Sequence, residues 1–164
     1  MVEAPDTRLP AGGDRDDREV VAELLGRAPQ CAFEVVVRDG HGLPRVIRNA
    51  AFLDDGTPMP TRYWLVGAAD RLAVSRLEST GAITQVAAEV PEQAIADAHR
   101  RYAAERDAAI ADDHPGPRPS GGVGGTRRGL KCLHAHYAWY LAGGEDPVGA
   151  WVAAAIERAH GDTP

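Results

Sequence analysis

Cysteine is scarce in this sequence, and its scarcity excludes two kinds of protein. Cys31 and Cys132 are the only two among 164 residues. Two cysteines cannot form the disulfide network that holds small secreted domains together, and they cannot supply a four-thiolate zinc site. Because thiols stay unpaired in a reducing compartment, we expect the protein in the cytoplasm.

Long apolar runs and an excess of positive charge are lacking as well. No run approaches the roughly 18 apolar residues of a membrane-spanning helix, and the first residues contain no apolar core typical of a signal peptide. Lys and Arg number 18 against 24 Asp and Glu, which gives a net charge of −6. A protein that coats nucleic acid needs the opposite sign. We therefore predict neither a membrane span nor a nucleic-acid partner.

The remaining composition suits one folded domain. Hydrophobic residues make up 44% of the chain, which is enough for a core. Residues 1–17 are rich in proline, glycine and acids, and we expect a disordered lead-in there. Residues 18–160 are expected to form a single domain with a loop rich in glycine and proline at 113–126, followed by a tail at 161–164.

β-branched stretches between turn-forming residues predict a small sheet. Gly40 and Gly42 indicate the turn of a hairpin between the first two strands. Before the two strands we expect a short helix at 18–27, because Gly26 and Pro29 are residues that end helices. The expected strands are 32–37, 45–48 and 63–66.

After Gly67 the apolar spacing changes from two residues to about 3.6, which indicates helices. The first helical stretch is interrupted near Gly81. Asp146 followed by Pro147 is typical of the start of a helix. The later expected helices are 91–112, 127–142 and 147–160.

Together these elements predict the fold class. Three strands followed by four or five helices indicate an α+β domain, in which a small antiparallel sheet of about three strands is covered by helices. The charged residues of the 91–112 helix, His99 and Arg106 among them, are expected on a solvated face.

The only lysine of the chain lies beside one of the two cysteines and two of the six histidines. If the helix is regular there, Cys132 and His136 are neighbours four residues apart. On the same helix His134 lies roughly 160° around from Cys132, so the three side chains cannot hold one metal ion. The segment is Gly129-Leu130-Lys131-Cys132-Leu133-His134-Ala135-His136.

Three interpretations of this segment remain open. Cys132 and His136 can be a small buried hydrophobe and a hydrogen-bonded core histidine. They can be two ligands of a zinc ion that His41 and Asp39 of the hairpin turn complete. Alternatively, Cys132 is a reactive thiol near the start of a helix, where Lys131 and His136 favour the thiolate. We expect no cofactor, with zinc as the alternative.

A glycine-rich stretch leads into the same segment and predicts an anion site. Glycines let successive backbone N–H groups converge, and the N-terminus of a helix is partly positive. The stretch lacks the Gly-Lys-Ser/Thr ending of a nucleotide-binding phosphate loop, and a flexible linker is the alternative interpretation. The candidate ligand-binding residues are Gly122, Gly124, Gly125, Arg127, Arg128 and Lys131.

Several motifs occur together between Leu24 and Val152. Besides the two segments above they are Leu25-Gly26-Arg27, Arg76-Leu77-Glu78, Ala98-His99-Arg100-Arg101-Tyr102, Leu141-Ala142-Gly143-Gly144, Asp146-Pro147-Val148-Gly149 and Asp55-Gly56-Thr57-Pro58-Met59-Pro60-Thr61-Arg62-Tyr63-Trp64-Leu65. In combination they resemble the bacterial, mainly actinobacterial, family called domain of unknown function 501, which has no established activity. Genes of this family often lie near those for enolase, a septum-formation protein and an exopolyphosphatase. The resemblance thus implies partners in cell division or polyphosphate metabolism.

The chain departs from the pattern of this family at two places. Asp39 stands where relatives commonly have a cysteine, and Val66-Gly67-Ala68 stands where they commonly have Thr-Cys-Pro. In relatives those cysteines and Cys132 would make a metal or redox cluster. Because two of the thiols are missing here, we expect this chain to purify without stoichiometric zinc.

We predict from these observations a protein that binds a small anionic ligand, with phosphate or carboxylate groups, where the glycine-rich stretch meets the following helix. Its reaction stays unassigned. The alternative is a non-catalytic interaction module linked to cell division or envelope functions, to which exposed aromatics such as Trp151 are suited. A pocket lined by Lys131 and the histidines favours ligand binding, whereas a flat apolar surface favours the module. The candidate catalytic residues are Cys132, His134 and His136.

Overall fold

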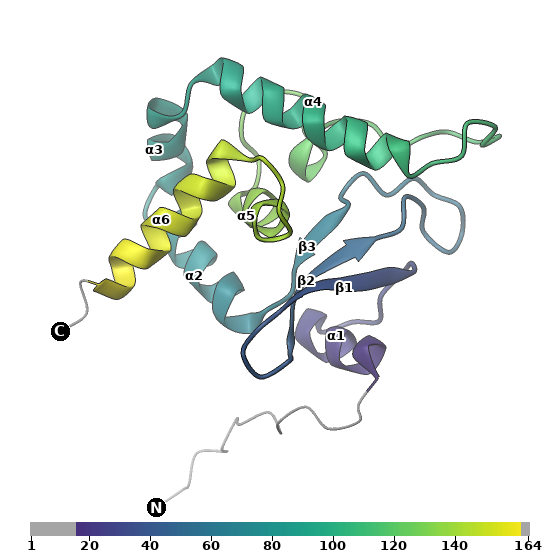
Figure 1. The fold of residues 1–164 in the computed structure, drawn as a ribbon, viewed down its shortest axis with the longest axis horizontal. Coiled ribbons are helices and arrows are strands. Elements are labelled where there is room, and N and C mark those ends of the chain that lie inside the picture. Colours follow the sequence, from purple (N-terminus) through teal and green to yellow (C-terminus); the bar gives the residue numbers. More distant parts are fainter. Residues whose placement is uncertain (1–15, 162–164) are drawn as a thin grey trace, which may run out of the picture.

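The chain has the predicted α+β fold. The computed structural model describes residues 16–161, so the predicted lead-in and tail lie almost wholly outside the described residues. A three-stranded antiparallel sheet packs against helices (Figure 1). The strands, in spatial order, are β1 (Phe33–Arg38), β2 (Pro44–Asn49) and β3 (Tyr63–Leu65). The six α-helices of the described residues, one more than the predicted upper number, are α1 (Asp17–Leu25), α2 (Ala68–Ser79), α3 (Ala82–Glu89), α4 (Glu92–Ala108), α5 (Leu133–Leu141) and α6 (Pro147–Gly161).

The predicted hairpin turn joins β1 and β2. Asp39 Oδ1 accepts hydrogen bonds from the backbone N–H groups of His41 and Leu43. Gly42 adopts a φ of 81°, which residues with a side chain disfavour. Asp39 and His41 therefore shape this turn.

Apolar side chains on the two faces of the sheet belong to two separate clusters. Successive residues of a strand point to opposite faces. Accordingly, Ile47 packs with Val21 of α1 in one cluster, while its neighbour Val46 packs with residues of α2 to α6 in the other. One face of the sheet is thus covered by α1 and the other by the remaining helices.

Helix α5 lies in the middle of the second cluster. Figure 1 shows it nearly end-on between the sheet and α6, and it packs on both β3 and α6. From Leu133 to Trp139 every residue except His134 is buried. The helix therefore buries nearly its whole circumference, and His134 is the one position of this run that is partly open to solvent.

The start of α5 differs from the prediction. The sequence predicts this helix from Arg127, but it begins at Leu133. Gly129 adopts a positive φ of 63°, which a helix does not contain, and Cys132 is extended with φ −152° and ψ 115°. The expected helical angle between Cys132 and His134 is therefore wrong, because Cys132 lies before the helix.

The end of α4 also differs, because this helix stops at Ala108 rather than at Asp112. The predicted loop that follows contains a short 3₁₀ turn, η1 (Val123–Gly125). None of the described helices combines the length and the apolar character needed to cross a membrane.

Candidate functional site

A cleft of about 590 Å³ opens where the end of α1, strand β3, helix α2, the η1 turn and the start of α5 meet. Three basic side chains and the two aromatic side chains Tyr63 and Trp64 border it. Cys132 and His134 lie in the same lining. The residues that carry its chemistry are Arg27, Trp64, Arg71, Lys131, Cys132 and His134.

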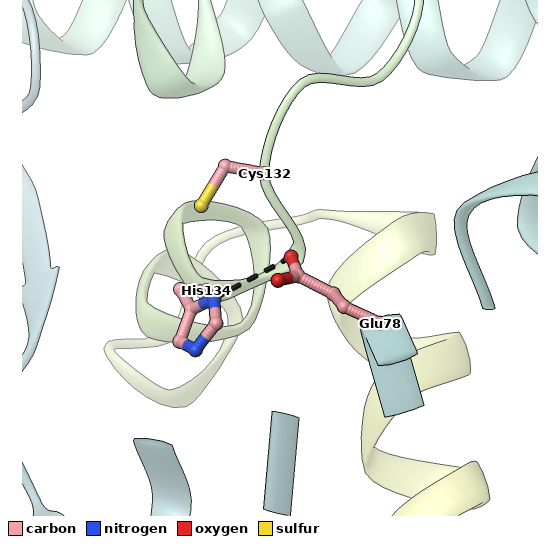
Figure 2. Close-up of side chains that lie close together, drawn as sticks. All are labelled: Glu78, Cys132 and His134. Carbon is pink, nitrogen blue, oxygen red and sulfur yellow. Dashed lines mark ion pairs between the residues drawn. The ribbon is translucent and has the colours of Figure 1, made fainter. Parts of the chain in front are cut away.

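Glu78, near the end of α2, joins Cys132 and His134 in a compact cluster (Figure 2). The three side chains each offer one ligand atom, and these atoms all lie within 4.8 Å of one another. His134 Nδ1 lies 3.4 Å from Glu78 Oε1. The same oxygen accepts a hydrogen bond of 2.9 Å from the backbone N–H of Leu133, so the carboxylate also holds the first turn of α5.

The contacts of Nε2, the second ring nitrogen of His134, show that this nitrogen carries a proton. Nε2 lies 3.3 Å from the carbonyl oxygen of Arg71 and 3.1 Å from the hydroxyl of Ser75. A carbonyl oxygen can only accept a hydrogen bond, so Nε2 carries a hydrogen. Nδ1 is thereby left to face Glu78 and Cys132.

The ionisation of Cys132 and His134 is shifted in opposite directions. Burial by itself raises the pKa of the Cys132 thiol, but its hydrogen bond with His134 and the nearby Ala135 amide outweigh burial and lower that pKa. The hydrogen bond with Cys132 raises the pKa of His134 against the opposing effect of burial, and the charge of Glu78 raises it further. Both shifts favour a thiolate beside an imidazolium.

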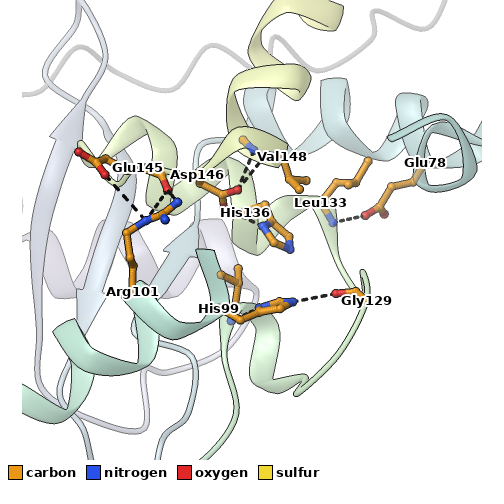
Figure 3. A network of polar contacts seen from close by, with 11 residues as sticks. Glu78, His99, Arg101, Gly129, Leu133, His136, Glu145, Asp146 and Val148 are labelled. Carbon is orange, nitrogen blue, oxygen red and sulfur yellow. Dashed lines mark hydrogen bonds and ion pairs between the residues drawn. The ribbon is translucent and has the colours of Figure 1, made fainter. Parts of the chain in front are cut away.

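Side chains of helix α4 hold the glycine-rich stretch, and Figure 3 shows one of them, His99, in contact with Gly129. His99 Nδ1 accepts the backbone N–H of Val123 at 3.0 Å, and its Nε2–H donates to the carbonyl oxygen of Gly129 at 2.8 Å. The Arg106 guanidinium donates to the carbonyl oxygen of Gly121 at 2.7 Å. These contacts make the stretch a fixed loop rather than a flexible linker.

The predicted solvated face of α4 is accordingly wrong for two residues. His99 and Arg106 are buried, with 5% and 2% of their surface exposed. A Cβ on Gly122 would lie 2.5 Å from His99 Cβ, so only glycine allows this close approach.

The structure brings four of the predicted site residues together at the cleft and places the others elsewhere. Gly122 lies against His99 and Gly125 against Pro60, away from the cleft lining. Arg127 and Arg128 are exposed on the loop and do not line the cleft. The four at the cleft are Gly124, Lys131, Cys132 and His134.

His136 lies in the interior instead. It is fully buried, and its Nδ1–H donates to Asp146 Oδ2 at 2.6 Å. Asp146 Oδ1 accepts the N–H groups of Val148 and Gly149, which makes Asp146 the predicted cap of α6 (Figure 3). His136 is therefore a hydrogen-bonded core histidine that ties α5 to α6.

The metal-ligand set proposed from the sequence is not the one that the fold assembles. Among residues 16–161 the group of three or more potential ligands is Glu78, Cys132 and His134. His136 is paired with Asp146, and Asp39 is used in the hairpin turn. Sequence reasoning missed Glu78, and the one signal for it was its place in the Arg76-Leu77-Glu78 motif.

Comparison with known proteins identifies the family of this chain. Neither a curated protein nor a solved structure matches the chain. The model of one family, described as "Protein of unknown function (DUF501)", matches residues 35–154, which include nearly all of the sheet, α2 to α5 and most of the cleft. The chain therefore belongs to the DUF501 family, as its motifs predict.

Proposed function

We propose that this protein binds a small anionic ligand, with phosphate or carboxylate groups, in the cleft above Cys132 and His134. The observation that carries the proposal is the convergence of Arg27, Arg71 and Lys131 on one cleft of a chain whose net charge is −6. Basic groups that gather in a concave site of an acidic protein raise the local concentration of anions there.

Two of the three basic side chains are held in place by neighbours. The guanidinium carbon of Arg27 lies 5.1 Å from the ring centroid of Trp64, and Nη1 of Arg27 donates to Gln30 Oε1 at 3.3 Å, so its other N–H groups are the ones available to a ligand. One nitrogen of Arg71 donates to the carbonyl oxygen of Leu24 at 2.6 Å, and its other N–H groups remain as donors. Planar guanidinium groups suit carboxylate and phosphate oxygens because they donate two parallel hydrogen bonds.

Lys131 completes this set from the loop. It is exposed, borders the cleft, and lies directly before Cys132 at the start of α5. A lysine at the N-terminus of a helix meets the positive end of the helix dipole, so its placement is mildly unfavourable for folding. Binding of an anion would offset that repulsion.

The interaction-module alternative has less support. Trp151, the aromatic expected on the surface, is half-buried, and its indole N–H donates to Glu89 Oε2 at 2.7 Å. The large hydrophobic side chains exposed in the described part of the chain are Leu72 and Tyr140. A cleft with a lysine and a histidine in its lining is the arrangement that favours a ligand.

Location and partners are part of the same proposal. Both cysteines are free thiols, which supports a cytoplasmic location. The resemblance to a family encoded near an exopolyphosphatase makes polyphosphate one ligand to test, and division or polyphosphate proteins the partners to test.

Thermal denaturation with increasing anion concentration tests this function. Inorganic phosphate, sulfate, citrate and a short polyphosphate are the probes, with chloride at equal ionic strength as the control. A ligand that binds only the native state raises the unfolding midpoint with its concentration. We expect at least one of the four anions to do so in the wild-type protein. An unchanged midpoint with all four would contradict the proposal.

A further inference from the structure

We propose that Glu78, Cys132 and His134 bind a zinc ion whose fourth coordination position faces the cleft. This site is assembled by the end of α2 and the start of α5, and it includes a carboxylate that the sequence analysis did not consider. The metal site stands on its own geometry; only the ligand of its fourth position rests on the proposed function.

The donor atoms match zinc better than other common cations. A thiolate, an imidazole nitrogen and a carboxylate oxygen are the ligand types that zinc takes, whereas calcium and magnesium take oxygen almost exclusively. Ligand atoms of a tetrahedral zinc ion lie about 3.5 Å from one another, given the usual zinc–ligand distances. The 3.4 Å between His134 Nδ1 and Glu78 Oε1 already fits, and Cys132 Sγ lies within 4.8 Å of a ligand atom of each of the other two residues.

Outer contacts orient two of the three ligands. The Nε2–H of His134 points to the carbonyl oxygen of Arg71, so Nδ1 is the nitrogen that binds the metal, after the metal displaces the proton of the imidazolium. Metal-binding histidines usually donate their second N–H in this way. The Leu133 amide donates to Glu78 Oε1 and fixes the carboxylate beside the ring.

The cleft supplies the open position. Cys132 and His134 both line it, so an ion held between them and Glu78 has one side toward the cleft. Three protein ligands with a fourth, exchangeable position are typical of catalytic zinc rather than structural zinc. Zinc with one thiolate and one carboxylate has no net charge, so these ligands do not repel an anion at the fourth position. The positive charges of Arg27, Arg71 and Lys131 attract that anion.

The cysteines that this chain lacks are not needed for this site. Gly67, where relatives commonly have one of them, directly precedes α2, whereas Glu78 lies near the end of that helix. About 16 Å of helical rise separates the two positions. A thiol at position 67 is therefore not required beside Cys132, and its absence does not weaken the cluster around Glu78.

Cobalt substitution tests the site directly. Chelator-treated protein is titrated with Co²⁺, whose near-ultraviolet charge-transfer band reports a bound thiolate and whose visible bands report four-coordination; zinc is then added to displace it. We expect one Co²⁺ per chain with a thiolate band in the wild type. Cys132→Ser should remove the band, and Cys31→Ser, at the other thiol, should keep it.

Glu78→Gln separates metal binding from folding. The glutamine oxygen can still accept the Leu133 N–H, so the metal-free variant should fold, with a thermal midpoint lowered only by the lost ion pair between Glu78 and His134. Its zinc affinity should nevertheless fall by more than the roughly 10–100-fold that loss of an outer contact produces. Equal zinc affinity in wild type and Glu78→Gln, or a thiolate band that survives Cys132→Ser, would overturn the site.

Failure of this inference can be told apart from failure of the proposed function. Arg128→Met should bind zinc as tightly as the wild type, because this side chain lies outside the cleft lining. If anions raise the midpoint of chelator-treated protein and no thiolate band forms, the cleft function stands and the zinc site is wrong. If zinc binds and none of the four anions shifts the midpoint, the zinc site stands and the anion function is wrong.

Discussion

The Nδ1 atom of the buried His136 lies 2.6 Å from Oδ2 of Asp146, and this contact joins α5 to the first turn of α6. Asp146 serves both helices at once, since its other oxygen caps α6 through Val148 and Gly149.

Asp146→Ala should therefore destabilise the protein by about 2–4 kcal/mol, from the lost cap and the lost hydrogen bond of a charged group. The free energy of unfolding is measured by urea denaturation. Glu145→Ala, at the exposed neighbouring position, should change it by less than about 0.5 kcal/mol. If both variants were equally stable, the contact between His136 and Asp146 would not be what joins the two helices.

Gly122→Ala should disturb the floor of the cleft. The new Cβ would lie 2.5 Å from His99 Cβ and Nδ1, so the loop or α4 has to move. We expect a loss of about 1–3 kcal/mol in the free energy of unfolding, as for other overpacked sites. Gly40→Ala is the matched control, because a Cβ there meets open space and should be nearly neutral. A neutral Gly122→Ala would show that His99 does not fix the loop.

The two cysteines should react with iodoacetamide at different pH. The thiolate is the reactive form, so a lowered pKa moves the rise in rate to lower pH and a raised pKa moves it to higher pH. In metal-free protein Cys132 should react at lower pH than an ordinary thiol, because hydrogen bonding to His134 outweighs its burial. Cys31 should react at higher pH, because burial raises its pKa.

Mass spectrometry of the alkylated sites over a pH series measures this difference. His134→Ala should move the curve of Cys132 toward that of an ordinary thiol and leave Cys31 unchanged. Equal profiles for the two cysteines would contradict the assigned pair, and protection of Cys132 alone by added zinc would agree with the metal site.

The elements of the fold could largely be predicted from local sequence. Stretches of β-branched and aromatic residues between turn-forming residues predict three strands close to their observed bounds. The start of α5 could not be predicted, because Gly129 and the extended Cys132 break the helix while the apolar spacing continues across them. Hydrophobic periodicity alone does not report such a break.

The candidate site could be predicted only in part. Lys131, Cys132 and His134 lie together in sequence, so their unusual composition was visible. Glu78 reaches them only through the packing of α2 against α5, which no local pattern reports. His99 was expected on a solvated face because it lies in a helix rich in charged residues. The sequence of such a helix does not distinguish a histidine exposed to solvent from one that is hydrogen-bonded to a buried loop.

Lys131→Met gives the most direct test of anion binding in the cleft. Because the lost ammonium repels the positive end of α5, the variant should be as stable as the wild type or slightly more stable. Arg128→Met, on the same loop but outside the cleft lining, is the matched control.

The decisive measurement is a calorimetric titration of the wild type and these two variants with one anion. That anion is the one that most raises the unfolding midpoint of the wild type. Lys131→Met should weaken its binding by about tenfold or more, the factor expected for a hydrogen bond to a charged group, and Arg128→Met should bind as the wild type does. Equal affinity in all three proteins, or a larger loss in Arg128→Met than in Lys131→Met, would contradict an anion site in the cleft.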